Sequence, residues 1–177
     1  MRKLRLEELK RLSVADYKKA KKRSLVIILD NIRSMHNVGS IFRTADAFRI
    51  AKVYLCGITP KPPHREIRKT AIGAEESVDW EAHAYTIQVV QALKHAGYEI
   101  LSLEQTEGSR ELGKFTPAGN KNYAIVLGHE VDGVSQTIID QSDEVLEIPQ
   151  YGTKHSLNVS VSAGIALYHI CSGMGDL

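Results

Sequence analysis

The sequence predicts an α/β domain with a mainly parallel sheet flanked by helices. Five short runs rich in aliphatic and β-branched residues alternate with stretches of helical periodicity, which is the pattern of such folds. Three of these runs end in polar loops rich in functional side chains, after Asp30, Leu127 and Ile148. Ligands of parallel sheets bind beyond the carboxyl ends of the strands, so these three loops are the candidate functional regions.

The elements follow from apolar runs and their punctuation. We expect strands at residues 25–30, 52–58, 98–105, 123–128 and 144–149, each a compact apolar run. Helices are expected from about Val38, around residues 66–71, over 84–97, after residue 129, and from Val159 onward. An extended piece is expected to lead toward Trp80, and residues 106–121 are expected to be irregular.

Length and composition indicate one ordinary globular protein. The chain has 177 residues, 43% of them hydrophobic and 25% charged, and no apolar run reaches the length of a membrane span. Charges occupy the N-terminus where a signal peptide needs its apolar stretch. The two cysteines, Cys56 and Cys171, have no metal-ligand spacing. We therefore expect a cytoplasmic protein with reduced thiols, without a metal site and without a membrane segment.

The charge is unevenly distributed along the chain. Residues 1–23 hold ten Lys or Arg and three Asp or Glu, a net charge of +7, whereas the remainder carries −5. Residues 1–23 are therefore predicted to be a basic, helical N-terminal extension, and residues 24–177 the main domain. The extension is either a solvated helix end or an arm that contacts phosphates.

The loop after Asp30 contains Asn37, Gly39 and Arg43. If a helix begins near Val38, Asn37 caps it, Gly39 leaves its first turn open, and Arg43 projects near free backbone N–H groups. This arrangement would suit an RNA phosphate. The alternative is an ordinary helix cap beside a surface arginine.

The other two loops carry further candidates. Glu130 follows a strand and is expected at the carboxyl edge of the sheet, although a carboxylate at a helix start would look the same. Ser156 and Asn158 are both good helix caps, and only one can cap the closing helix, so the other is free to bond a ligand. The small residues of that helix, Ser160, Ser162, Ala163 and Gly164, would let another backbone approach it closely.

The three segments together resemble a known family. N-x-G-x-x-x-R-T-A, V-L-G-x-E-x-x-G-V and I-P-x-x-G-x-x-x-S-L-N-V-S occur in this order, each beside a predicted strand. They resemble the three signature motifs of the SpoU (TrmH-like) RNA 2′-O-ribose methyltransferases of the SPOUT superfamily. The resemblance covers residues 25–170. Neither of the glycine-rich nucleotide motifs, GxGxxG and GxxxxGK[ST], is present.

The resemblance implies a fold, a cofactor and a set of site residues. It implies a deep C-terminal trefoil knot, a homodimer, and S-adenosylmethionine as the cofactor. The implied cofactor-binding residues are Leu103, Glu104, Leu127, Gly128, Ile148 and Leu157. The implied catalytic residues are Arg43, Asn37, Glu130, Ser156 and Asn158.

The implied activity is methylation of a ribose 2′-OH in RNA, with tRNA favoured over rRNA by the small size of the chain. Three alternatives stay open at this point. They are a knotted methyltransferase that acts on a base atom, an RNA-binding protein without activity, and a doubly wound domain that binds a different nucleotide.

Overall fold

Strands and helices alternate along most of the chain, as predicted. The computed structural model describes residues 1–175 and 177. The strands are β1 (Arg23–Asp30), β2 (Ile50–Cys56), β3 (Trp80–His83), β4 (Tyr98–Leu103), β5 (Arg110–Glu111), β6 (Asn122–Leu127) and β7 (Glu144–Glu147). The α-helices are α1 (Val14–Lys19), α2 (Met35–Ala47), α3 (Arg65–Ala71), α4 (Ala74–Ser77), α5 (Thr86–His95), α6 (Gln136–Ile139) and α7 (Val159–Gly173). Two short 3-10 helices are η1 (Leu6–Leu9) and η2 (Leu112–Lys114).

The sheet has seven strands in the order β3-β2-β1-β6-β4-β7-β5. Every pairing between neighbouring strands is parallel, so the predicted fold class is confirmed. All five predicted strands are present, with bounds shifted by up to two residues at either end. The two additional strands, β3 and β5, form the two edges of the sheet. The prediction missed β5 because it consists of two charged residues, and it left out α4 and η2 as well.

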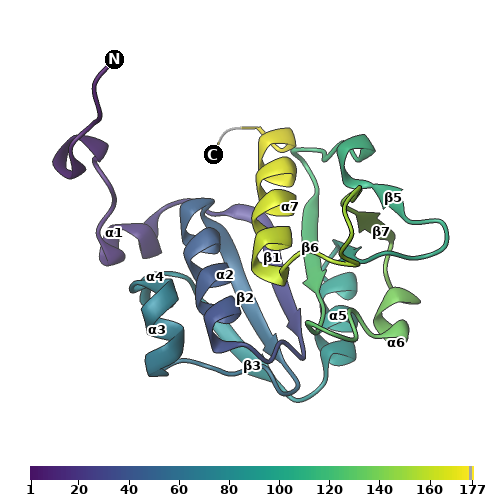
Figure 1. The fold of residues 1–177 in the computed structure, drawn as a ribbon. Helices are drawn as coiled ribbons and strands as arrows, with labels where there is room; N and C mark the ends of the chain where they lie inside the picture. Colours follow the sequence, from purple (N-terminus) through teal and green to yellow (C-terminus); the bar gives the residue numbers. More distant parts are fainter. Residues whose placement is uncertain (176) are drawn as a thin grey trace.

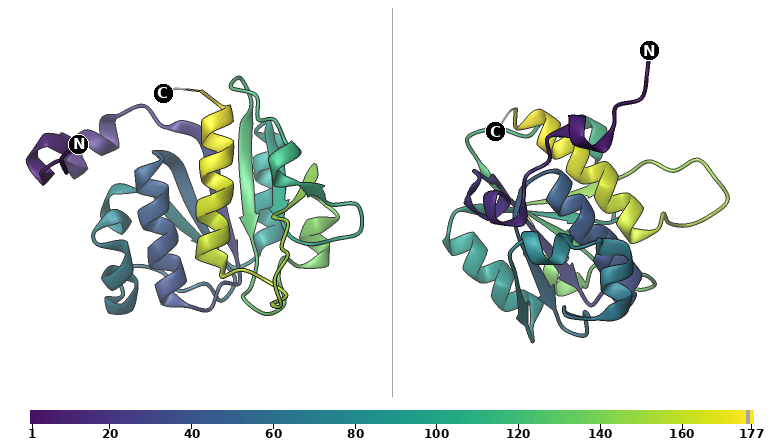
Figure 2. Two further views of the ribbon diagram at one scale, coloured as in Figure 1. Left: turned by 45° about the horizontal axis from the view of Figure 1, so that its top comes forward. Right: turned by 90° about the vertical axis from the view of Figure 1, so that its left-hand side faces the viewer.

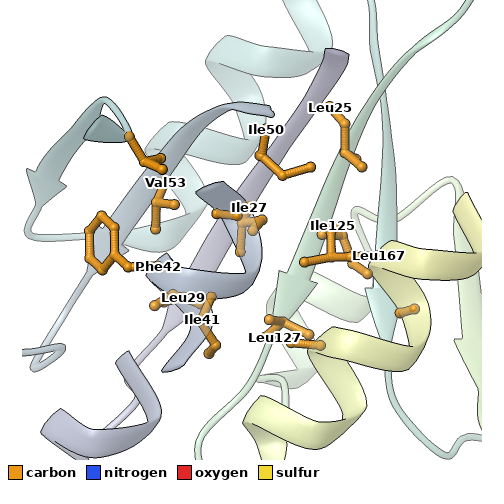
Figure 3. Close-up of a cluster of buried hydrophobic side chains, with 14 of the residues drawn as sticks. Leu25, Ile27, Leu29, Ile41, Phe42, Ile50, Val53, Ile125, Leu127 and Leu167 are labelled. Carbon is orange, nitrogen blue, oxygen red and sulfur yellow. The ribbon is translucent and has the colours of Figure 1, made fainter. Parts of the chain in front are cut away.

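Helices cover both faces of the sheet (Figure 1). The side chains of β1 point alternately to the two faces and belong to two clusters of buried residues. Leu25, Ile27 and Leu29 join the larger cluster of buried side chains with α2, α3 and α7, and Figure 3 shows its centre. Val26 and Ile28 point to the other face, where α5 and α6 pack. Because both faces are covered, the central strands read as continuous apolar runs rather than alternating ones.

The start of α2 differs from the prediction. The helix begins at Met35, and Ser34 caps it by accepting a hydrogen bond from the Asn37 backbone N–H at 3.3 Å. Asn37 is therefore inside the first turn and is buried, not a cap. Gly39 does not leave space for a ligand either, because a Cβ there would stand 2.2 Å from the Ile67 carbonyl oxygen of α3. Its role is close packing of α3 on α2.

The two ends of the chain lie at the same end of the molecule, beyond the amino ends of the strands (Figures 1 and 2). The N-terminal residues 1–23 contain η1 and α1, and buried Tyr17 of α1 anchors them to the core. The closing helix begins at Val159 as predicted, with Asn158 as its cap. It packs against α2 and, through a hydrogen bond between His169 and the Phe115 carbonyl, against the segment after η2. Within the described residues, no helix combines the length and apolar character that crossing a membrane requires.

Candidate active site

A cavity of about 460 Å³ lies at the carboxyl ends of three neighbouring strands, β6, β4 and β7. Leu127 ends β6, Leu103 ends β4, and Ile148 directly follows β7, and all three line the cavity. The loops that follow these strands complete its wall. The position agrees with the rule that ligands of parallel sheets bind beyond the strand ends.

Most of the predicted site residues meet at this cavity. All six residues expected to bind a cofactor line it: Leu103, Glu104, Leu127, Gly128, Ile148 and Leu157. Three of the residues expected to be catalytic also line it: Glu130, Ser156 and Asn158. The other two, Asn37 and Arg43, lie outside the lining set.

The loop after β6 folds back tightly on its own start. His129 and Gly133 exchange two backbone hydrogen bonds, of 3.0 and 2.9 Å. A Cβ at Gly128 would stand 2.1 Å from the Gly133 carbonyl carbon and from the Val134 nitrogen, so only glycine fits there. This tight turn brings backbone groups, rather than side chains, to the cavity wall at Gly128.

Glu104 and Gln105 support two different loops of the cavity. The Glu104 carboxylate accepts a hydrogen bond from the Val134 N–H at 2.9 Å and so holds the end of the loop after β6. The Gln105 side chain donates to the His155 carbonyl at 2.9 Å and holds the loop after β7. The end of β4 therefore positions the walls on both of its sides.

Glu130 joins the cavity to the start of α2. Its carboxylate accepts hydrogen bonds of 2.9 Å from the Arg33 and Ser34 N–H groups and of 3.0 Å from the Asn37 side-chain amide. Burial alone would raise the pKa of the Glu130 carboxyl, but these bonds together outweigh it and lower the pKa. The group is thus held as a carboxylate at neutral pH, and it satisfies free donors at the helix start.

Asn37 continues this network to the closing helix. Its side-chain oxygen accepts a hydrogen bond of 3.1 Å from the Asn158 side-chain amide. The Asn158 side-chain oxygen in turn accepts from the Ser160 N–H at 2.9 Å and caps α7. One chain of side-chain contacts, Glu130 to Asn37 to Asn158, therefore links all three sequence motifs.

Asn158, rather than Ser156, caps the closing helix, which resolves the choice left open by the sequence. Ser156 is exposed at the cavity wall, and no hydrogen bond of its hydroxyl is found within the described part of the chain. It is therefore free to bond a ligand. Lys154 is also exposed, but it does not line the cavity.

Arg43 lies farther from the cavity than the sequence suggested. Because α2 starts at Met35, Arg43 falls in the third turn of the helix instead of the first, away from the free N–H groups. Its side chain is exposed, and it forms no hydrogen bond or ion pair with any other described residue. The guanidinium is thus available to an external anion.

Sequence reasoning missed several groups at this end of the sheet. Asp132 and Glu147 add two carboxylates to those of Glu104 and Glu130, and the lining set contains no lysine or arginine. Asp30, buried at the end of β1, accepts hydrogen bonds from Thr86, Asn31 and Ser135. Two of these residues could have been found from their place in the sequence. Asp30 and Glu147 are acidic residues at the last position of a strand, next to the edge where ligands bind.

Comparison with known proteins identifies the family of this chain. Residues 24–168 match the SpoU rRNA Methylase family. The chain is 32% identical to the tRNA (guanosine(18)-2'-O)-methyltransferase of Aquifex aeolicus, over 84% of this chain and 69% of that protein. It is 34% identical to the 23S rRNA (guanosine-2'-O-)-methyltransferase RlmB of Neisseria meningitidis, over 81% of this chain and 56% of that protein.

A solved structure shares the fold. The AdoMet-bound rRNA methyltransferase from Sinorhizobium meliloti matches with a TM-score of 0.80 at 23% identity, over 90% of this chain and 61% of that one. The chain spans about three fifths of the length of several curated relatives that it matches. The family match covers most of the chain and includes all three motifs of the site. The chain therefore belongs to the SpoU rRNA methylase family.

Proposed function

We propose that this protein transfers the methyl group of S-adenosylmethionine to a ribose 2′-OH of RNA. The observation that carries the proposal is the contact chain from Glu130 through Asn37 to Asn158. It brings the three motifs of the family together beside one cavity at the carboxyl edge of the sheet. The relatives named above, a tRNA and an rRNA 2′-O-methyltransferase, support the same reaction.

The cavity suits S-adenosylmethionine in size and charge. Its volume of about 460 Å³ is typical of small-molecule sites. Leu103, Leu127 and Ile148 offer apolar surface to an adenine ring. Four carboxylates without a lysine or arginine favour a sulfonium cation and disfavour the pyrophosphate of a dinucleotide, which argues against the alternative of a different nucleotide. When bound, the cofactor supplies an already activated methyl group.

The side chains of the site would position the ribose and stabilise the negative charge that develops on its 2′ oxygen. Arg43 binds the phosphate next to the target ribose and stabilises the alkoxide that develops on the 2′ oxygen. A guanidinium is a very weak acid and a reluctant base, so Arg43 acts mainly through charge and hydrogen bonds. Ser156 and Asn158 orient the ribose, while Glu130 and Asn37 hold the two helix starts in place.

The test is a methylation assay with purified protein, methyl-labelled S-adenosylmethionine, and tRNA or rRNA. We expect label in nucleotides that resist alkaline cleavage, because a 2′-O-methyl group removes the attacking hydroxyl. Label in alkali-sensitive nucleotides would indicate a methyltransferase that acts on a base atom. Cofactor and RNA binding without any transfer would indicate a non-catalytic RNA-binding protein.

We propose tRNA as the substrate, with rRNA as the alternative. We also propose a cytoplasmic location. The chain spans a larger share of the tRNA-modifying relative than of the rRNA-modifying one, 69% against 56%. The two buried, unpaired cysteines suit a reducing compartment. Nucleoside mass spectrometry of tRNA and rRNA from a deletion strain would identify the substrate.

We also propose that the segment after β7 is threaded to form a deep trefoil knot. Two features support this path. β7 pairs between β4 and β5, whereas α7, which follows it, packs against α2 in the first half of the chain. Gly173 at the end of α7 also lies against Pro117, which precedes β6. An experimental electron-density map traced through residues 104–173 would test the threading.

A homodimer is proposed from the outer surface of α7. Val161, Ile165 and Tyr168 are 51%, 41% and 65% exposed, and their spacing places them on one helix face. A Cβ added at Gly164, which lies between them, would meet no atom of another element within 4 Å, so a partner backbone could approach there. A second copy of the chain would cover this apolar stripe.

A further inference from the structure

A second cavity, of about 680 Å³, lies between α3, α4 and the start of β3. It shares no lining residue with the cavity at β6, β4 and β7. Trp80, the only tryptophan of the chain, stands half-buried in its wall and packs on the core behind it. The cis bond between Pro62 and Pro63 forms another part of the wall.

Three cations of α3 face this cavity. Arg65, Arg68 and Lys69 all line it, and their spacing places them on one side of the helix. Arg65 forms no hydrogen bond or ion pair with another described residue. Arg68 meets Glu76 at 3.4 Å, but both side chains are more than half exposed, and such pairs are weak. Lys69 is paired with Glu66 at 2.8 Å. The cavity therefore offers an aromatic surface beside one arginine without an internal partner among the described residues, Arg65, and one weakly paired arginine, Arg68.

Glu75, which also lines the cavity, has a buried oxygen atom without a hydrogen-bond donor in the described part of the chain. The Oε2 atom of Glu75, a residue that lines the cavity, is buried and has no hydrogen-bond partner within the described residues. Buried acceptors are nearly always paired, so a ligand or water molecule that donates to this atom would complete its hydrogen bonding.

One part of the second cavity, at the start of α3, lies toward the carboxyl ends of the strands, where the candidate active site is. Glu130 binds the start of α2, and His36 in the first turn of α2 contacts Glu66 of α3 at 3.0 Å. The starts of α2 and α3 are thus neighbours, and Figure 1 shows both near the carboxyl ends of the strands. An RNA strand that reaches the ribose site could continue across α2 to this cavity.

We infer that this cavity binds an unpaired nucleotide of the substrate RNA. The base stacks on Trp80, the phosphate meets Arg65 and Arg68, and the Glu75 carboxylate accepts an N–H of the base. Stacking on aromatic side chains and contact with nearby cations are the usual means of holding single-stranded nucleic acid. The inference rests on the proposed function for the identity of the RNA partner.

The fluorescence of Trp80 tests this directly, because no other tryptophan contributes to the signal. Titration of the full-length protein with 5′-GMP should quench it saturably, and ribose 5-phosphate, which lacks the base, should not. The Arg65→Ala, Arg68→Ala double variant should weaken GMP binding by about tenfold, because charge-assisted hydrogen bonds are lost. Linear quenching equal to that of free N-acetyltryptophanamide would overturn the inference.

A second experiment measures the binding of a short fluorescein-labelled RNA by fluorescence anisotropy. The double variant and Trp80→Phe should each bind the RNA more weakly, whereas Lys114→Ala, a matched exposed cation beyond the opposite edge strand, should bind as the wild type does. Equal affinity in all variants would overturn the inference. Calorimetric titration of the protein with S-adenosylmethionine separates the two proposals. Normal cofactor binding without a Trp80 fluorescence response would refute only nucleotide binding at the second cavity. Absence of cofactor binding would refute the proposed function.

Discussion

The side-chain amide of Asn158 donates a hydrogen bond of 3.1 Å to the side-chain oxygen of Asn37, although 121 residues separate them. Asn37 also donates to Glu130, and Asn158 caps α7. The start of α2, the start of α7 and the loop after β6 are therefore one hydrogen-bonded unit. Substitutions at Glu130, Asn37 and Asn158 should therefore have non-additive effects on stability, since hydrogen-bonded side chains are coupled energetically.

The Glu130 carboxylate should make stability depend on pH. Its pKa is lowered in the folded protein from the ordinary value of 4.5, so folding favours the charged form. This contribution is fully present above about pH 4.5 and is lost as the pH falls through the folded-state pKa. Glu130→Gln should cost about 1 kcal/mol at neutral pH, and its Tm should fall less steeply than that of the wild type in acid. Parallel Tm curves for the two proteins would contradict this role.

Gly128→Ala should distort the cofactor cavity. The added methyl group would stand 2.1 Å from backbone atoms of Gly133 and Val134, so the loop must move. We expect a loss of about 1–3 kcal/mol of stability, typical of overpacking, and much weaker cofactor binding. Gly113→Ala is the matched control, because Gly113 lies in η2, outside the three motifs, and a Cβ there has no neighbour within 4 Å. Thermal unfolding and calorimetric titration of S-adenosylmethionine would measure both, and a Gly128→Ala protein with wild-type affinity would refute the expectation.

Arg43→Ala should retain cofactor binding and lose methylation. Arg43 lies outside the cavity and has no internal partner among the described residues, so its removal should leave the fold and the cofactor site intact. Loss of charge stabilisation in the transition state should reduce kcat by about 10²–10³-fold. Arg43→Lys keeps the charge without the planar fork and should recover only part of the rate. Methylation by Arg43→Ala at the wild-type rate would show that another group fills this role.

The sequence predicted the elements that bury apolar runs and missed those that do not. β1 and β6 are covered on both faces and carry clear apolar runs, whereas β5 is Arg110–Glu111 at an edge, where charge is tolerated. The six predicted cofactor residues meet at one cavity because motifs that follow parallel strands share the same edge. The cap of α2 was misplaced because Ser34 and Asn37 are both good caps. The side chain of Asn37 bonds to Glu130 instead of capping the helix, and Glu130 lies 93 positions away in the sequence. The local sequence therefore could not show which of the two residues is the cap.

Ile165→Asp should convert the proposed dimer into a monomer. Ile165 is central to the exposed stripe of α7 and is 41% exposed, so a carboxylate there is solvated in the single chain. In a dimer the same charge would be buried in an apolar contact without a partner, which is strongly unfavourable. Ile58→Asp, at a 64% exposed apolar residue outside α7, is the control and should leave the assembly unchanged. Light scattering coupled to size-exclusion chromatography gives the mass, and equal masses for Ile165→Asp and the wild type would rule out this face as the interface.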